Sequence, residues 1–208
     1  MTRELTFYFD YTSPFTYLAA MRIDAFARDH ALELRWEPAF LGAILKATGN
    51  RPPAEVPARG RYLLLDLVRH ATREGVPFRF SPHFPLDTKA ALRGALAVRA
   101  EAPSAYHDYN LAVFRAAWAE GRDVADPAVL AALARAVGVD PAIVTAAADA
   151  PHYKQLLHVQ TDHALAAGAF GMPFFVLDAD GARECYFGND RLELIDARLR
   201  RGVPWPTA

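Results

Sequence analysis

The chain contains a single cysteine, Cys185, among its 208 residues. One cysteine excludes a disulfide within the chain and a dithiol that cycles between oxidised and reduced forms. An excess of charge is also missing, because 23 Lys and Arg stand against 24 Asp and Glu, which gives no electrostatic reason to expect nucleic acid or an anionic membrane as partner. No run reaches the ~18 apolar residues of a membrane span, and no secretion signal precedes the first predicted strand. We therefore expect a soluble, cytoplasmic protein that binds neither nucleic acid nor membrane.

Patterns typical of metal and phosphate sites are absent too. His158 and His163 are five residues apart, so on a helix they point about 140° away from each other. There is no His-Glu-x-x-His pattern, no second cysteine and no Gly-rich loop of the kind that holds phosphates. We therefore predict no metal site. Cys185 is expected on a strand near the end of the chain, packed in the core or half-buried.

The first forty residues combine strand and helix patterns. Residues 5–10 are almost all apolar and β-favouring, which predicts a buried strand. A helix is predicted over residues 14–30, with Thr12 or Ser13 as its N-cap. Residues 32–37 alternate between polar and apolar, as a second strand does. Together these segments predict a β-α-β unit of the size of a right-handed crossover.

The middle of the chain is helical, and β character returns near the end. Strands are predicted at residues 174–177 and 183–187, joined by a turn at residues 178–181, and a last helix at residues 192–201. Pro and Gly separate the helical segments, and two of these begin at an Asp-Pro step, where Asp caps and Pro fits the first turn. The segments with helical periodicity are residues 60–74, 87–101, 104–120, 126–137 and 140–148.

This order of elements predicts an α/β, thioredoxin-like fold: β-α-β, a block of helices, then β-β-α around a mixed sheet. Residues 1–40 and 166–208 would form the thioredoxin-like domain, and residues 41–165 an all-helical insertion domain. A thioredoxin-type fold presents its reactive loop after the first strand and a facing proline before a later strand. Here that loop carries Ser13, and the facing proline is Pro173.

Ser13 has two interpretations. A serine beside a proline at a helix start is usually only a cap. Its place after the first strand, opposite Pro173, instead favours a hydroxyl that stabilises a thiolate belonging to another molecule. A free thiol has a pKa of roughly 8.5 and is only about 3% ionised at pH 7, so a hydrogen bond and the positive end of a helix favour the reactive anion. A nucleophilic role is not predicted, because no His and Asp stand in a triad pattern.

Five motifs follow one another in order along the chain. They are Phe9-Asp10-x-x-Ser13-Pro14, Thr48-Gly49-Asn50-Arg51-Pro52-Pro53, Phe84-Pro85, Gly171-Met172-Pro173-Phe174-Phe175-Val176 and Phe187-Gly188-Asn189-Asp190-Arg191-Leu192. With these motifs the chain closely resembles the 2-hydroxychromene-2-carboxylate isomerases and the kappa-class glutathione transferases, over about residues 5–200. The resemblance implies glutathione as cofactor, a small aromatic substrate and a homodimer.

The resemblance also implies roles for individual residues toward glutathione. Ser13 would hydrogen-bond the sulfur, and backbone groups at Met172, next to Pro173, would pair with the cysteinyl part. Asn50 and Arg59 would face the glycyl end. Both can donate hydrogen bonds to a carboxylate, which agrees with that role.

The γ-glutamyl end would be bound by Asn189 and Asp190, since Asp190 accepts hydrogen bonds from an ammonium group. Each assignment has a structural alternative: Asn50 as a turn residue, Arg59 as a solvated charge and Asp190 as a cap of the last helix. Kappa-class relatives tend to carry lysine where Arg59 stands and often serine where Asn189 stands. Arg59 keeps the positive charge of lysine but differs in reach and geometry. Asn189, like serine, can form hydrogen bonds.

The residues around the substrate have weaker signals. Lys46, on a helix that ends at Gly49, either reaches a substrate carboxylate or is a surface lysine. Tyr11 and Phe84 are predicted to wall a flat hydrophobic substrate, although most aromatic residues belong to the core. Three further aromatic residues share this prediction: Phe15, Phe40 and Tyr62.

The function implied by the resemblance is glutathione-dependent isomerisation of 2-hydroxychromene-2-carboxylate to trans-o-hydroxybenzylidenepyruvate in aromatic hydrocarbon catabolism. Addition of a thiolate held by Ser13 would let a double bond rotate before elimination restores it. A kappa-like glutathione transferase or peroxidase is the alternative enzyme. A redox-inactive thioredoxin-like binding module is the alternative without catalysis. A disulfide oxidoreductase is excluded, because the loop lacks both cysteines.

Overall fold

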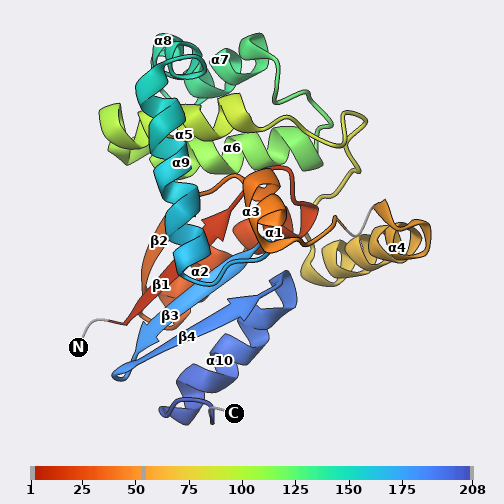
Figure 1. Cartoon of the computed structure of the whole chain (residues 1–208), viewed down its shortest axis with the longest axis vertical. Helices are drawn as coiled ribbons and strands as arrows, with labels where there is room; N and C mark the ends of the chain where they lie inside the picture. The colour runs from red at the N-terminus through yellow and green to blue at the C-terminus, as the bar shows by residue number, and fades with distance from the viewer. Residues whose placement is uncertain (1–2, 53–54, 207–208) are drawn as a thin grey trace.

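A four-stranded mixed sheet lies at the centre of the fold (Figure 1), and the structure, a computed structural model, describes residues 3–52 and 55–206. The strand order is β2-β1-β3-β4, with β1 parallel to β2 and antiparallel to β3, and β3 antiparallel to β4. The strands are β1 (Glu4–Phe9), β2 (Glu33–Pro38), β3 (Phe174–Ala179) and β4 (Ala182–Phe187). The predicted mixed sheet is confirmed, with strand limits within two residues of those predicted.

Helices flank the sheet and occupy the chain between β2 and β3. Outside that block are α1 (Pro14–Ala20), α2 (Ile23–Asp29), the 3₁₀ turn η3 (Asn189–Arg191) and α10 (Leu192–Arg201). Inside it are α3 (Leu41–Thr48), α4 (Pro57–Glu74), α5 (Lys89–Glu101), η2 (Pro103–Ala105), α6 (Tyr106–Trp118), α7 (Pro127–Ala136), α8 (Pro141–Ala147) and α9 (Pro151–Ala166). The limits of the two domains stay a prediction, and residues 1, 2, 207 and 208 of the outer one lie outside the described residues.

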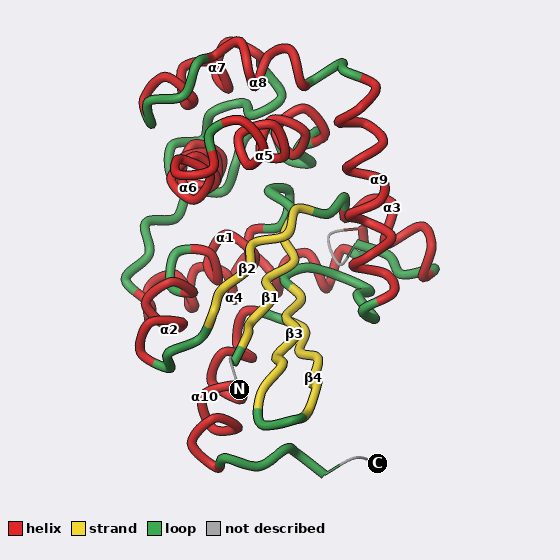
Figure 2. Tube along the Cα trace, turned by 90° about the vertical axis from the view of Figure 1, so that its left-hand side faces the viewer, coloured by secondary structure: helices red, strands yellow, loops and turns green. Residues whose placement is uncertain are grey.

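Both faces of the sheet are covered (Figure 2). Helices α1, α2 and α10 lie on one side and α3 and α9 on the other, while α5 to α8 gather beyond the carboxyl ends of β1 and β2. On the first side Phe7 packs against Trp36 and Phe175, with ring centroids 4.9 and 5.4 Å away. On the second side Tyr8 belongs to a separate apolar cluster that includes Ile44 of α3. Burial of β1 on both faces agrees with its composition, since four of its six residues are apolar or aromatic: Leu5, Phe7, Tyr8 and Phe9.

The predicted single helix over residues 14–30 is wrong, because the chain breaks it into α1 and α2. Arg22 leaves helical geometry at φ −121°, ψ −22°. Its guanidinium lies 3.1 Å from a carboxylate oxygen of Glu74 and donates to the side-chain oxygen of Asn189 at 3.1 Å. These long-range contacts outweigh the local helical periodicity.

The Asp-Pro helix starts are confirmed. Asp126 and Asp140 each accept a hydrogen bond from the backbone N–H two residues on, at 2.8 and 2.9 Å, and so cap α7 and α8. The limits of α9 were not predicted. Its buried residues are only Leu157, Thr161 and Ala164, too thin an apolar stripe to delimit a helix from sequence.

The predicted hairpin turn is also confirmed. Asp180 and Gly181 both have positive φ, 55° and 77°, which is the conformation that a two-residue β-hairpin requires. The fully buried Arg198 of α10 donates to Glu184 at 2.5 Å and to Asp180 at 3.0 Å. This pair of contacts fastens the last helix to the hairpin.

Helix α4, which projects sideways from the sheet (Figure 1), carries exposed apolar side chains. Tyr62, Leu65 and Val68 are 58%, 57% and 55% exposed, in contrast to the buried Leu67 on another side of the helix. Despite these apolar residues, none of the helices within residues 3–52 and 55–206 has the length and apolarity to cross a membrane.

Candidate active site

Ser13 lies in the loop that follows β1, at the edge of the sheet where the parallel strands end. Its hydroxyl oxygen accepts a hydrogen bond from Thr16 N–H at 3.2 Å, so Ser13 is the N-cap of α1. The same hydroxyl donates to the carbonyl oxygen of Met172 at 3.1 Å. The Met172-Pro173 peptide bond is cis, and Ser13, Met172 and Pro173 are all buried. The structure therefore brings the two predicted halves of the site together.

The helix behind Ser13 is shorter than predicted. α1 has seven residues rather than about sixteen, so fewer aligned peptide units contribute to the positive potential at its start. The Ser13 hydroxyl is a hydrogen-bond donor available to an anion at this edge, beside the start of α1. It is held in place by the contacts to Thr16 and Met172.

Asp10 organises this loop, a role that the sequence analysis missed. Its carboxylate is fully buried and accepts hydrogen bonds from Thr12 N–H at 3.0 Å, Thr88 Oγ1 at 2.6 Å and Leu41 N–H at 2.8 Å. Burial raises the pKa of the Asp10 carboxyl, and these three hydrogen bonds oppose that rise. Asp10 thus joins the Ser13 loop to the starts of α3 and α5. A lone acidic residue at the end of a buried apolar strand was the available signal.

Asn50 adjoins the segment before Met172. α3 ends at Gly49 with φ 70°, and the Asn50 amide donates to the carbonyl oxygen of Phe170 at 3.0 Å. Asn50 is exposed, as is Lys46 in the last turn of α3. Pro53, the last residue of the motif that contains Asn50, lies outside the described residues. The turn interpretation of Asn50 agrees with this geometry.

Arg59 borders a hollow of about 460 Å³ between α1 and α4. Two of the aromatic residues predicted to wall a substrate, Phe15 and Tyr62, lie in the same hollow. The lining consists of Phe15, Ala58, Arg59, Tyr62, Leu63 and Asp66. A cation at the rim of a mainly apolar hollow suits a ligand that combines a carboxylate with an apolar part.

Asn189 and Asp190 differ in their surroundings. Asn189 is buried, and its amide oxygen accepts from Arg22 at 3.1 Å while its amide nitrogen lies 3.4 Å from Glu74. Asp190 is exposed and forms an ion pair with Arg191. The alternative role of Asp190 as the cap of the last helix is wrong, because the N-cap of α10 is Arg191 and no side chain caps it.

Tyr11 is part of the core, so its predicted place in a substrate wall is wrong in this structure. It is fully buried, its ring packs against Phe9 and Phe114, and its hydroxyl donates to Asn110. Burial raises the pKa of that hydroxyl well above its usual value. A residue that follows a buried strand on the side of α6 has no access to an open pocket.

The other aromatic residues lie elsewhere. Phe84, half-buried, packs its ring against Phe80 and Trp118, at centroid distances of 5.2 and 6.2 Å. Its peptide bond to Pro85 is cis. Phe40 lines a different hollow, on the side of α9. The predicted aromatic wall is therefore divided among the core and two hollows.

Cys185 lies on β4, as predicted, but it is exposed, because it shares the open face of this edge strand with the exposed Arg183 and Phe187. Desolvation by neighbouring atoms raises the pKa of its thiol, so at neutral pH it is protonated. Among the residues that the structure describes, no group of three His, Cys, Asp or Glu side chains is placed to hold a metal ion.

A buried hydroxyl after the first strand, opposite a cis-prolyl segment and joined to it by a hydrogen bond, defines a thioredoxin-like site in which serine replaces the dithiol. The chain belongs to the DsbA-like thioredoxin domain family, which it matches over residues 4–200. This family membership confirms the predicted thioredoxin-like fold with its all-helical insertion.

Three comparisons show which proteins of known name this chain is similar to. The chain is 29% identical to the 2-hydroxychromene-2-carboxylate isomerase of Sphingobium xenophagum, over 96% of this chain and 99% of that protein. It is 27% identical to glutathione S-transferase kappa 1 of Homo sapiens, over 99% of this chain and 93% of that protein. A solved structure of a 2-hydroxychromene-2-carboxylate isomerase superposes with a TM-score of 0.84 at 27% identity, over 95% and 94% of the two chains. The resemblance found in the sequence is thereby confirmed.

Proposed function

We propose that this protein is a glutathione-dependent isomerase that converts 2-hydroxychromene-2-carboxylate to trans-o-hydroxybenzylidenepyruvate. Similarity to 2-hydroxychromene-2-carboxylate isomerases over nearly the whole chain supports the proposal. The observation that carries it is the buried Ser13 hydroxyl, bonded to Met172 beside a cis proline. The site is arranged to hold a sulfur atom that the chain itself does not supply.

Ser13 would act on the thiol of bound glutathione. In the free protein its hydrogen is directed at the Met172 carbonyl oxygen, and in the complex it would turn to the sulfur. The carbonyl of Met172, next to Pro173, would then accept from the cysteinyl N–H of glutathione. Lowering the thiol pKa by about two units requires roughly 2.7 kcal/mol of preference for the anion, which a charge-assisted hydrogen bond in a buried site can largely supply.

Bound glutathione would supply a thiolate able to add reversibly to the conjugated double bond of the ring-opened substrate, which would allow that bond to rotate without any oxidation or reduction. Ser13 would hold the sulfur as the anion, and Arg59 would bind a carboxylate away from the reacting atoms. A site that has no dithiol agrees with such a reaction.

The remaining groups would orient the two ligands. Arg59, at the rim of the apolar hollow, would bind a carboxylate, as would the exposed amide of Asn50. Asp190 would bind the ammonium group of the γ-glutamyl end, after exchanging its partner Arg191 for it. Asn189, already bonded to Arg22, would act by holding η3 in place. Lys46 would reach toward the substrate carboxylate.

We propose a cytoplasmic homodimer as the working form. The exposed apolar side chains Tyr62, Leu65 and Val68 on the projecting helix α4 support a protein contact there. Sedimentation equilibrium tests this, because charged replacements of Leu65 and Val68 would then shift a dimer to monomer without unfolding it. A monomer at micromolar wild-type concentration would contradict the dimer.

A glutathione transferase is the second candidate, supported by the similarity to glutathione S-transferase kappa 1 over 99% of this chain. The two activities differ in the fate of glutathione. An isomerase turns over many equivalents of chromene carboxylate while the glutathione concentration stays constant, whereas a transferase consumes one glutathione for each product. Turnover measured with and without glutathione, together with the remaining free thiol, separates them. Binding of glutathione with neither reaction would favour a redox-inactive binding module.

A further inference from the structure

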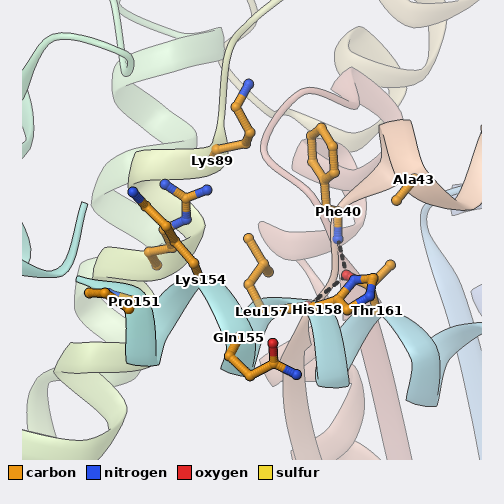
Figure 3. A pocket seen from close by; sticks show the side chains of 10 residues that line it. Phe40, Ala43, Lys89, Pro151, Lys154, Gln155, Leu157, His158 and Thr161 are labelled. Atoms are coloured by element: carbon orange, nitrogen blue, oxygen red, sulfur yellow. Dashed lines mark hydrogen bonds between the residues drawn. The ribbon is translucent and has the colours of Figure 1, made fainter. Parts of the chain in front are cut away.

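A second hollow, of about 410 Å³, lies between α5 and α9 and reaches the start of α3 (Figure 3). We call it the α5–α9 groove. Its lining residues are Phe40, Ala43, Lys89, Arg93, Pro151, Lys154, Gln155, Leu157, His158 and Thr161. It shares no lining residue with the hollow beside Arg59.

Positive charge is concentrated in this groove. Lys89 and Arg93 are one turn apart on α5, and Lys154 and His158 are one turn apart on α9, so both helices turn basic residues to the same space. None of the ten lining residues is acidic. Two of the three lysines in the whole chain lie here. In a chain with a net charge of −1, this is a local positive field rather than a reflection of composition.

The carboxylates nearest to these cations hold them weakly. Asp87 lies 2.7 Å from the Lys89 ammonium, but the two side chains are 57% and 44% exposed. Asp149 lies 3.4 Å from the Lys154 ammonium and is 97% exposed. Exposed ion pairs of this kind contribute little, so both lysines are available to a ligand in the groove.

Arg93 is held in place and incompletely bonded. Its Nη1 donates to the carbonyl oxygen of Ala148 at 2.6 Å, which ties the guanidinium to the end of α8. Its Nε is buried and has no hydrogen-bond partner among the described residues. A buried donor without an acceptor is unfavourable, so the described residues leave part of the hydrogen-bonding capacity of Arg93 unused.

The floor of the groove is apolar. Phe40, Ala43 and Leu157 line it, and the Lys89 ammonium lies 5.6 Å from the centre of the Phe40 ring. The Phe40 backbone is fixed by its N–H bond to Thr161 at 3.0 Å (Figure 3). A flat apolar body would rest on Phe40 and Leu157, and its anionic end would meet Arg93 and Lys154.

We propose that the α5–α9 groove is a binding site for a small aromatic carboxylate, separate from the glutathione site. The groove is also connected to the Ser13 loop. Phe40 precedes Leu41, and Lys89 follows Thr88; Leu41 and Thr88 are the two residues through which Asp10 holds that loop. A ligand in the groove therefore sits beside the anchors of the Ser13 loop without touching Ser13. The proposal does not depend on the isomerase activity.

The direct test is a calorimetric titration of the full-length protein with benzoate, without glutathione. We expect saturable binding with a Kd of about 1 mM or tighter, and much weaker binding of benzyl alcohol, which has the ring without the charge. Inorganic phosphate, which has charge without the ring, should also bind more weakly. Equal affinity for phosphate and benzoate would overturn the aromatic part of the proposal, and no binding of benzoate would overturn all of it.

Variants locate the site. Arg93→Gln and Lys154→Gln should each weaken benzoate binding at least about fivefold, because each removes a charged partner of the carboxylate. Arg135→Gln, an exposed arginine on α7 outside the groove, is the matched control and should not change it. Lys154 is exposed, so its variant stays informative if Arg93→Gln fails to fold. Unchanged binding in Lys154→Gln would place the carboxylate elsewhere and contradict the proposal.

Competition separates this site from the thiol site. Benzoate should bind with the same affinity in the presence of saturating glutathione and in the Ser13→Ala variant. Displacement of benzoate by glutathione would overturn the claim of a separate site, even if the isomerase activity is present. Conversely, benzoate binding in a protein with no isomerase activity would support the groove and count against the proposed function alone.

Discussion

The hydroxyl of Ser13 and the carbonyl oxygen of Met172, 159 residues apart in sequence, are joined by a 3.1 Å hydrogen bond. This bond joins the loop after β1 to the segment before β3. It orients the hydroxyl hydrogen of Ser13, which the capping of α1 alone does not require, because a cap uses only the oxygen. Removal of the hydroxyl should therefore have an effect on catalysis larger than its effect on folding.

Ser13→Ala should lower the isomerisation rate at least about a hundredfold, the usual cost of losing one donor to a developing or stabilised anion. Loss of the cap on α1 should destabilise the fold by only about 1 kcal/mol. Asp126→Ala is the control, since it removes a comparable cap from α7. Its free energy of unfolding should fall similarly while its turnover is unchanged. If turnover is lowered equally in Ser13→Ala and Asp126→Ala, Ser13 acts only as a structural cap and not on the thiol.

Asp10→Asn should destabilise the fold by about 1–3 kcal/mol and lower turnover as well, because the new amide nitrogen would face either Leu41 N–H or the groups now bonded to the other oxygen. Urea unfolding and steady-state kinetics measure the two effects. Asp87→Asn, at an exposed aspartate nearby, should leave both unchanged. Wild-type stability in Asp10→Asn would show that the carboxylate is not the anchor of the loop.

Arg59→Gln should raise the KM for glutathione or for the chromene carboxylate at least about fivefold, with a much smaller change in kcat, because Arg59 would bind a carboxylate away from the reacting atoms. Arg61→Gln, an exposed arginine two residues on that does not line the hollow, is the control. Equal KM values in Arg59→Gln and Arg61→Gln would show that Arg59 does not bind either ligand.

His107 should make stability depend on pH. It lies 2.5 Å from a carboxylate oxygen of Asp24, which raises the pKa of the imidazole above its usual value of 6.5. Since the folded-state pKa is the higher one, the stabilisation is fully present below the unfolded value and is lost as pH rises through the folded-state value. The free energy of unfolding should therefore fall as the pH rises above about 6.5, and His107→Gln should reduce this fall. His152→Gln, at an exposed histidine, is the control and should leave this fall unchanged. If the free energy of unfolding falls as steeply in His107→Gln as in the wild type, the assignment to His107 is wrong.

Local patterns predicted the elements whose causes are local. The alternation of β2, the apolar run of β1 and the Asp-Pro caps of α7 and α8 each arise from a few neighbouring residues. So does the Asp180-Gly181 turn, which requires residues that accept positive φ.

What the sequence could not supply depends on distant partners. Arg22 interrupts a good helical pattern because its side chain forms an ion pair with Glu74 and a hydrogen bond with Asn189. Tyr11 belongs to the core, where its hydroxyl donates a hydrogen bond to Asn110 on α6. The α5–α9 groove needs two helices far apart in sequence to turn their cations toward each other, and no motif within either helix indicates this.

The most direct test of the central claim is the pKa of the glutathione thiol when bound, from the ultraviolet absorbance of the thiolate as a function of pH. The account predicts a bound pKa about two units below the roughly 8.5 of a free thiol in the wild-type complex, and most of that shift lost in Ser13→Ala. The same bound pKa in both proteins would contradict it, and thiolate stabilisation would then have to be assigned to groups other than Ser13.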